Sequence, residues 1–87
     1  DDIDELDYYR SIQRAINAKS WSFQGSYGRV MMEAISYGYC LLGKEYAHDY
    51  YGNRIPSRSE VREGSKGSYE YVASLRGDNW ADLMEAV

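Results

Sequence analysis

Residues 28 to 43 read Gly-Arg-Val-Met-Met-Glu-Ala-Ile-Ser-Tyr-Gly-Tyr-Cys-Leu-Leu-Gly, the most apolar run of the chain. Its apolar residues recur at a spacing of three and four, which places them on one face of an α-helix: Val30, Met31, Ala34, Ile35, Gly38, Leu41 and Leu42. Gly38 then falls inside the helix, where glycine costs about 1 kcal/mol relative to alanine. We therefore expect a central helix over about residues 28–43, with Gly38 letting a neighbouring helix approach closely.

Shorter helical patterns lie on both sides of this run. Near the start, acidic residues precede Arg10 and Arg14, an order that complements the helix macrodipole. An apolar stripe in the same segment predicts a helix over about residues 3–18: Ile3, Leu6, Tyr9, Ile12 and Ile16. Near the other end, the pattern predicts a helix over residues 69–76 that stops at Gly77, and a last helix capped by Asp78 or Asn79.

These patterns define the expected fold class. A chain of 87 residues has the length of one domain, so we expect residues 1–87 to share a single core. The expected architecture is an all-α domain of four or five short helices around the central helix. Trp21 and Phe23 alternate with serines, which is the period of a short extended segment. If residues 19–25 and 50–56 pair, the fold becomes α+β with a minor extended element.

Charge is distributed unevenly along the sequence. The chain holds 14 acidic and 10 basic residues, for a net charge of −4, which disfavours sequence-independent binding to a nucleic-acid backbone. Acidic residues crowd the first turn of the first expected helix, and the candidate partner-binding set is Asp2, Asp4, Glu5 and Asp7. This cluster is either a solvated helix start or an acidic patch that meets a basic partner.

Residues 54–68 form a basic exception in this acidic chain. Four bases recur every fourth residue, and Ser57 with Glu60 fits a capping box, so a helical turn there would place the bases on one side. The Gly64–Ser68 loop precedes the expected helix 69–76, and amides at a helix N-terminus bind anions. The loop does not match the P-loop pattern. The alternatives are a solvated surface loop and an anion-binding site made by Arg54, Arg58, Arg62, Lys66 and Ser68.

The sequence contains no pattern that supports catalysis or cofactor binding. Cys40 lies on the flank of the expected central helix, partly exposed, and the lone histidine, His48, is more than two helical turns away. One histidine with scattered acids does not form a zinc site, so we expect no metal and no cofactor. No run reaches the roughly 18 apolar residues of a membrane span. A single cysteine favours a reducing compartment, and we expect a cytoplasmic protein that is not an enzyme.

The chain contains ten tyrosines, two tryptophans and one phenylalanine. This composition suits partly hydrated surfaces and protein interfaces, because tyrosine can bury its ring while its hydroxyl stays in contact with water. In size, acidity and tyrosine content the chain is similar to small phage-borne inhibitors of bacterial enzymes, including nucleic-acid mimics and anti-CRISPR proteins. This resemblance rests on composition and implies a partner protein, such as a nucleic-acid-binding enzyme, that is inhibited or regulated. The alternative is a module that binds an anion, a nucleotide or nucleic acid through residues 54–68. Assembly with its own copies is a third option.

Overall fold

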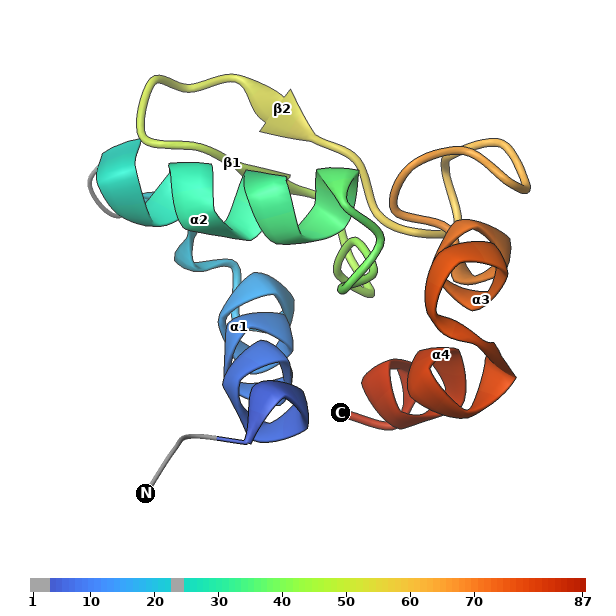
Figure 1. The fold of residues 1–87 in the computed structure, drawn as a ribbon. Coiled ribbons are helices and arrows are strands. Elements are labelled where there is room, and N and C mark those ends of the chain that lie inside the picture. The colour runs from blue at the N-terminus through green and yellow to red at the C-terminus, as the bar shows by residue number, and fades with distance from the viewer. Residues whose placement is uncertain (1–3, 23–24) are drawn as a thin grey trace.

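The computed structural model describes residues 4–22 and 25–87, and these residues form a mostly helical fold with a small antiparallel sheet (Figure 1). Its elements, in order, are α1 (Glu5–Asn17), the short 3-10 helix η1 (Ser20–Ser22), α2 (Gly25–Ser36), β1 (Ala47–His48), β2 (Arg54–Ile55), α3 (Tyr69–Arg76) and α4 (Asp78–Glu85). Helices predominate, as the sequence predicts. Among the described helices, none has the length and apolar character needed to cross a membrane.

The central helix is shorter than the apolar run predicts. α2 ends at Ser36, and Gly38 has a φ of +80°, a conformation that favours glycine. The amides of Gly38 and Tyr39 donate to the carbonyls of Ile35 (3.1 Å) and Ala34 (2.9 Å), the pattern of a Schellman motif that ends a helix. The expectation that the helix continues to residue 43, with Gly38 in its interior, was therefore wrong.

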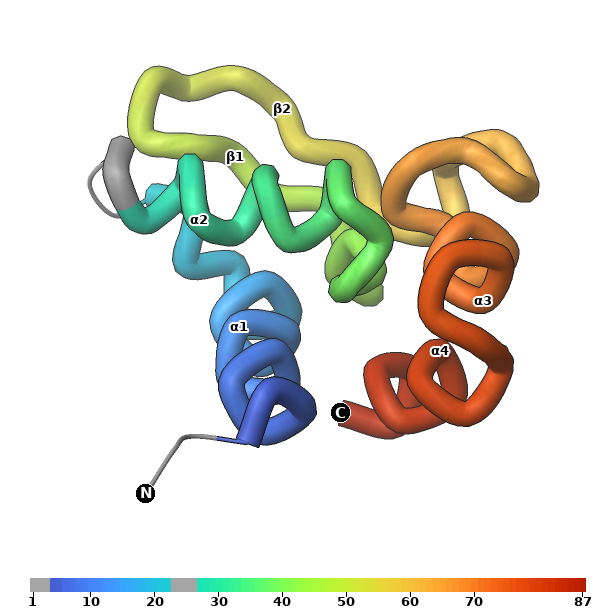
Figure 2. Tube along the Cα trace, viewed as in Figure 1, coloured from blue at the N-terminus to red at the C-terminus, as the bar shows by residue number. Residues whose placement is uncertain are grey.

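The rest of the run crosses the core without helical structure. Cys40 and Leu41 are completely buried, and Leu42 is nearly so. In Figure 2 the chain turns back at the end of α2 and passes between α1 and the α3 side of the molecule. The amide of Leu42 donates to the carbonyl of Gly67 (3.0 Å), which ties this segment to the loop before α3. Leu41 and Leu42 are therefore buried as predicted, but they do not belong to a helix.

The helices at the two ends lie where their sequence patterns place them. α1 lies within the predicted segment, and the Asp4 carboxylate caps it by accepting from the Leu6 amide (3.3 Å). α3 covers Tyr69–Arg76 as expected, and Gly77, with a φ of +97°, separates it from α4. Gly77 is also the N-cap of α4, which has no side-chain cap, so the expectation that Asp78 or Asn79 caps this helix was wrong. Ile3 and Phe23 lie outside the described residues.

The sheet joins segments other than those that the sequence indicates. β1 pairs with β2 in antiparallel register, with Ala47 opposite Ile55 and His48 opposite Arg54. Residues 20–22 form the 3-10 helix and β2 pairs with β1, so the described residues do not form the alternative pairing of 19–25 with 50–56. Asp49 closes the turn of the hairpin, because its Oδ1 accepts from the amides of Tyr51 (2.9 Å) and Asn53 (2.8 Å).

One tryptophan and the single cysteine lie in the core, and two tyrosines pack at its edge. Trp21 is 3% exposed, so its ring packs in the core. Cys40 is 0% exposed, which corrects the expectation of a partly exposed thiol, and burial raises its pKa to about 12. The half-buried rings of Tyr9 and Tyr39 stack with centroids 4.0 Å apart, and the Arg76 guanidinium lies 3.6 Å from the Tyr39 centroid. Several tyrosines are therefore structural.

Candidate functional site

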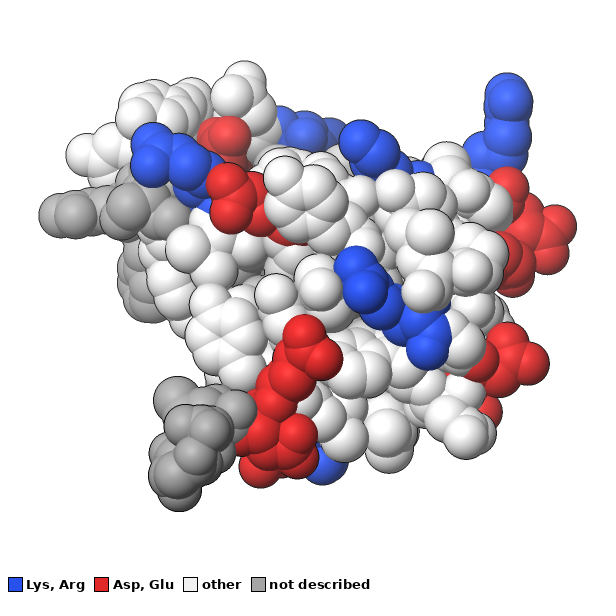
Figure 3. Space-filling view, in the orientation of Figure 1, with Lys and Arg blue, Asp and Glu red and all other residues white. Residues whose placement is uncertain are grey.

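The acidic residues of the sequence analysis lie at the start of α1. Asp4 is the N-cap of that helix, whereas Glu5 and Asp7 are exposed in its first turn. Asp2 lies outside the described residues. On the face drawn in Figure 3, acidic side chains of the described residues form several separate groups with basic side chains between them. The residues that the structure describes therefore form no single acidic surface on that face.

The four bases of residues 54–68 have different surroundings. Arg54 pairs with Glu60 (2.7 Å) and lies over the Tyr46 ring (4.5 Å to the centroid). The half-buried Arg58 donates through Nε to the Leu42 carbonyl (2.8 Å), and burial lowers the pKa of its guanidinium. Arg62 and Lys66 are exposed. Because residues 58–60 form a turn and not a helix, the four-residue spacing does not place these bases on one helical face.

The Gly64–Ser68 loop is held together by its own hydrogen bonds. Ser68 is buried, and its Oγ accepts from the amides of Gly64 (3.1 Å) and Tyr71 (3.2 Å) and donates to the Ser65 carbonyl (2.7 Å). The amide of Ser68 also donates to the Ser65 carbonyl (3.0 Å). These groups cap α3 and close the loop, so the amides of Gly64 and Ser68 already have protein acceptors.

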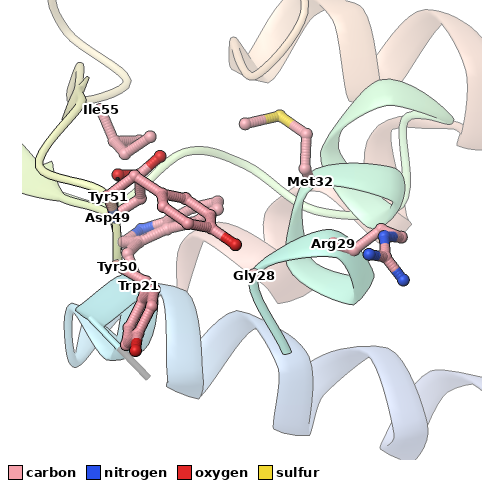
Figure 4. Close-up of a pocket in the computed structure, with 8 residues that line it drawn as sticks. All are labelled: Trp21, Gly28, Arg29, Met32, Asp49, Tyr50, Tyr51 and Ile55. Carbon is pink, nitrogen blue, oxygen red and sulfur yellow. Dashed lines mark hydrogen bonds between the residues drawn. The ribbon is translucent and has the colours of Figure 1, made fainter. Parts of the chain in front are cut away.

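A pocket of about 310 Å³ lies between α2 and the β1–β2 hairpin. Gly28, Arg29 and Met32 line it from α2, and Figure 4 shows the Arg29 side chain extending away from the hairpin residues. The remaining lining residues are Trp21, Asp49, Tyr50, Tyr51 and Ile55. Trp21 and Ile55 are buried and form its apolar base, while Tyr50 and Tyr51 are 58% and 75% exposed at the hairpin turn. We call these eight residues the α2–hairpin pocket.

Asp49 holds the hairpin side of this pocket in place. Burial alone would raise the pKa of its carboxyl, but hydrogen bonds from Asn53, Tyr51 and Gly52 lower the pKa below its ordinary value. The carboxylate therefore stays charged at neutral pH and is already engaged with the turn. Its contribution is to fix the backbone that carries the two tyrosines.

A second, more polar hollow of about 600 Å³ lies on residues from η1, β1 and the loops beside them. Its charged residues are largely paired with one another or with neighbours. Lys19 pairs with Glu45 (2.9 Å), and Glu60 pairs with Arg54. Because these charges have partners within the protein, we regard this hollow as a less suitable ligand site than the α2–hairpin pocket.

The nucleophilic and metal-ligating residues do not gather anywhere in the described part of the chain. Cys40 is buried, and its thiol donates to the Tyr9 carbonyl (3.4 Å). His48 is exposed on β1, where its ring lies edge-on to Tyr46 (5.8 Å between centroids). Residues 4–22 and 25–87 contain no group of three histidine, cysteine or acidic residues placed to hold a metal ion.

Sequence reasoning missed the α2–hairpin pocket because its residues come from three separate segments. The paired tyrosines before Gly52 and Asn53 gave a signal, since they suit either core cover or a recognition surface. The exposure of Tyr50 and Tyr51 favours recognition. Gly28 gave no signal of its own, because it read as the first residue of the central helix.

Comparison with protein-family models, with curated proteins and with solved structures found no match to this chain. The class that the structure itself defines is a small, mostly helical protein with an aromatic pocket between a helix and a hairpin.

Proposed function

We propose that this chain is a non-enzymatic protein-binding domain that inhibits or regulates the partner it occupies. The observation that carries the proposal is the α2–hairpin pocket with its exposed rim of Tyr50, Tyr51 and Met32. Tyrosine and methionine are among the residue types enriched at protein interfaces, and both occur at this rim. Hot spots also concentrate where an aromatic group can be desolvated in a pocket.

The rigidity of the rim adds to this support. Tyr50 and Tyr51 lie in a turn whose backbone is fixed by Asp49, and their rings contact each other edge-to-face (5.2 Å between centroids). A tyrosine held in this way loses little conformational entropy on binding. Truncation of one such residue at an interface costs about 2 kcal/mol or more when it is a hot spot.

The acidic first turn of α1 has a secondary part in the proposal. Glu5 and Asp7 are exposed and add to a net charge of −4, so they favour encounter with a basic partner such as a nucleic-acid-binding enzyme. Exposed charges of this kind affect the association rate and its salt dependence more than the final affinity. We therefore place the specific contact at the α2–hairpin pocket and the long-range attraction at α1.

The first experiment identifies the partner and then maps the contact. The immobilised protein is incubated with nuclease-treated lysate of the cells that make it, and the retained proteins are identified by mass spectrometry. The purified partner is then titrated calorimetrically against the wild type and Tyr51→Ala. Tyr37→Ala is the matched control, because Tyr37 is a comparably exposed tyrosine (62%) that does not line the pocket.

We expect Tyr51→Ala to weaken binding by tenfold or more and Tyr37→Ala to leave it within twofold. A double change of Glu5→Gln and Asp7→Asn should slow association and reduce its salt dependence. The proposal would be refuted if nuclease abolished all capture, or if only the double change of Arg62→Ala and Lys66→Ala released the ligand. That second result would assign the function to anion binding by residues 54–68.

A further inference from the structure

Gly28 lies within α2, at a position where neither the backbone conformation nor close packing requires glycine. Its φ lies outside the positive range, and a Cβ built on it would meet no described heavy atom within 4 Å. A glycine inside a helix costs roughly 0.5–1 kcal/mol relative to alanine. Local rules of this kind are broken mainly where function requires it.

Two other glycines show what a structural requirement looks like in this protein. A Cβ at Gly38 would lie 2.6 Å from the Leu75 side chain, and a Cβ at Gly67 would lie 2.5 Å from Leu42. Both glycines also have positive φ angles. Gly28 has neither reason to be glycine, and the space that its missing side chain leaves open belongs to the α2–hairpin pocket.

The walls of this space indicate an apolar occupant with a ring. Its base is Trp21 and Ile55, its side is the Met32 thioether, and the Tyr51 ring extends over it from the hairpin (Figure 4). A volume of about 310 Å³ is at the lower end for ligand pockets. It suits one aromatic side chain with part of its backbone better than an extended chain.

The charged residues that line the pocket indicate which kind of residue would lie next to the aromatic side chain of the partner. The two charged lining residues are Arg29 and Asp49. Asp49 already accepts hydrogen bonds from the turn amides, whereas Arg29 is exposed on the surface of α2. Because the Asp49 carboxylate is already hydrogen-bonded, Arg29 is the charged lining residue that can pair with a carboxylate. Its side chain extends away from the hairpin in Figure 4, so such a carboxylate would lie beside the pocket and not inside it.

We propose that the pocket opened by Gly28 receives an aromatic side chain of a partner protein, with an adjacent acidic residue facing Arg29. This inference rests on the proposed function and names the partner segment that the α2–hairpin pocket recognises. Gly28 keeps the cavity open, Trp21 and Met32 contact the ring, and Arg29 selects the neighbouring carboxylate.

The test uses capped tetrapeptides and amide chemical shifts of the ¹⁵N-labelled protein. The probe is acetyl-Gly-Phe-Glu-Gly-amide, and the two controls replace Phe by Ala or Glu by Lys. We expect saturable shifts at Gly28, Met32 and Tyr51 with the probe, and an apparent Kd about tenfold higher for each control peptide. Equal shifts with all three peptides, or shifts elsewhere on the protein, would overturn the inference.

Two variants that are expected to fold test the pocket from the side of the protein. Gly28→Leu fills the pocket at a helical position and should abolish the shifts caused by the probe, while retaining the circular dichroism of the wild type. Arg29→Glu should reverse the preference, so that the Phe-Lys peptide binds more tightly than the Phe-Glu peptide. Unchanged binding by Gly28→Leu, or an unchanged preference in Arg29→Glu, would each contradict the proposal.

The two proposals fail in different ways. If the partner protein depends on Tyr51 but the probe does not bind, the inference about the aromatic anchor is wrong and the protein-binding function stands. If the probe binds at the pocket but the partner is insensitive to Tyr51 and Gly28, the pocket is a peptide or small-molecule site and the proposed interface is wrong.

Discussion

Gln13 is a polar side chain at the centre of the core, with no exposed surface. Its Oε1 accepts from the Leu41 amide (2.7 Å), and its Nε2 donates to the Leu41 carbonyl (3.0 Å). These two bonds replace the partners that Leu41 would have had in a helix or a sheet. The amide of one side chain thus makes it possible for irregular backbone to cross the core, since buried peptide groups without partners are costly.

This role predicts the effect of replacing Gln13 by methionine, which has a similar size and lacks both hydrogen-bonding groups. Gln13→Met leaves the amide and carbonyl of Leu41 buried without these partners, and we expect it to lower the free energy of unfolding by about 2–4 kcal/mol. Urea denaturation followed by circular dichroism measures the change. Arg14→Met, at the next and exposed position of α1, should change stability by less than about 0.5 kcal/mol. Similar stabilities for the two variants would contradict this role.

At the scale of elements, two glycines of the same apolar run have opposite effects on α2. Gly28 lies inside the helix with open space around it, whereas Gly38 ends the helix with a positive φ and close contact to Leu75. The sequence alone presents both as residues of one helix. Their difference depends on the contacts of each position.

These environments predict stability changes of opposite sign for the same substitution. Gly28→Ala should raise the free energy of unfolding by about 0.5–1 kcal/mol, because alanine favours the helix and meets nothing. Gly38→Ala should lower it by about 1–3 kcal/mol through backbone strain and the contact with Leu75. Thermal and urea denaturation of both variants check the signs. Stabilisation by Gly38→Ala would show that the helix continues past Ser36.

The turn after β2 depends on an ionised carboxylate. A hydrogen bond from Arg54, followed by those from Ser57, lowers the pKa of Glu60 to about 2 from an ordinary value of 4.5. The Ser57 amide bond (3.1 Å) is the half of the predicted capping box that forms. The Ser57 hydroxyl instead interacts with Ser59 (3.0 Å).

A lowered folded-state pKa fixes the direction of the pH effect. The contribution of Glu60 to stability is fully present above the unfolded value of 4.5 and is lost as the pH falls towards 2. We therefore expect Glu60→Gln to flatten the decline of the urea midpoint between pH 4.5 and pH 2. Glu63→Gln, in the same loop, controls for the change in net charge. Parallel pH profiles of the wild type and Glu60→Gln would exclude the linkage.

At the scale of the whole molecule, Asn17 joins parts of the chain that are distant in sequence. Its Oδ1 accepts from Gln13 Nε2 (3.2 Å) and Arg58 Nη2 (3.3 Å), and its Nδ2 donates to the Val87 carbonyl (3.1 Å). Arg58 also donates to the Leu42 carbonyl. One small polar network therefore joins α1, the irregular segment 39–43, the loop after β2 and residue 87.

A shared network predicts that its members are not energetically independent. We expect Asn17→Ala and Arg58→Ala each to lower the free energy of unfolding, and the double variant to lose less than the sum by at least about 0.5 kcal/mol. A double-mutant cycle by urea denaturation measures this coupling. Lys66→Ala, an exposed residue of the same basic segment, should have little effect. Additive losses would show that the two side chains act separately.

The sequence by itself determined the elements whose signals are local. α1, α3 and α4 follow from apolar spacing, from the order of charges in α1 and from the glycine stop at Gly77. It also predicted the burial of Met31, Ala34, Ile35, Leu41 and Leu42 in the 28–43 run, whereas Val30 is exposed and Cys40 is buried, against expectation. Tertiary structure decided how the end of that run is buried, because the Gln13 amide and the Gly67 carbonyl supply hydrogen bonds that a helix would otherwise provide.

The candidate site depended on tertiary structure even more strongly. Trp21, Gly28 and Tyr51 come from η1, α2 and the hairpin turn, and only packing brings them around one pocket. Arg58, which sequence spacing grouped with a basic surface, instead points into the structure, because a carbonyl and an amide oxygen are there to accept its hydrogen bonds. Sequence patterns report the preferences of neighbouring residues, whereas pockets and networks form between segments that meet only in the folded chain.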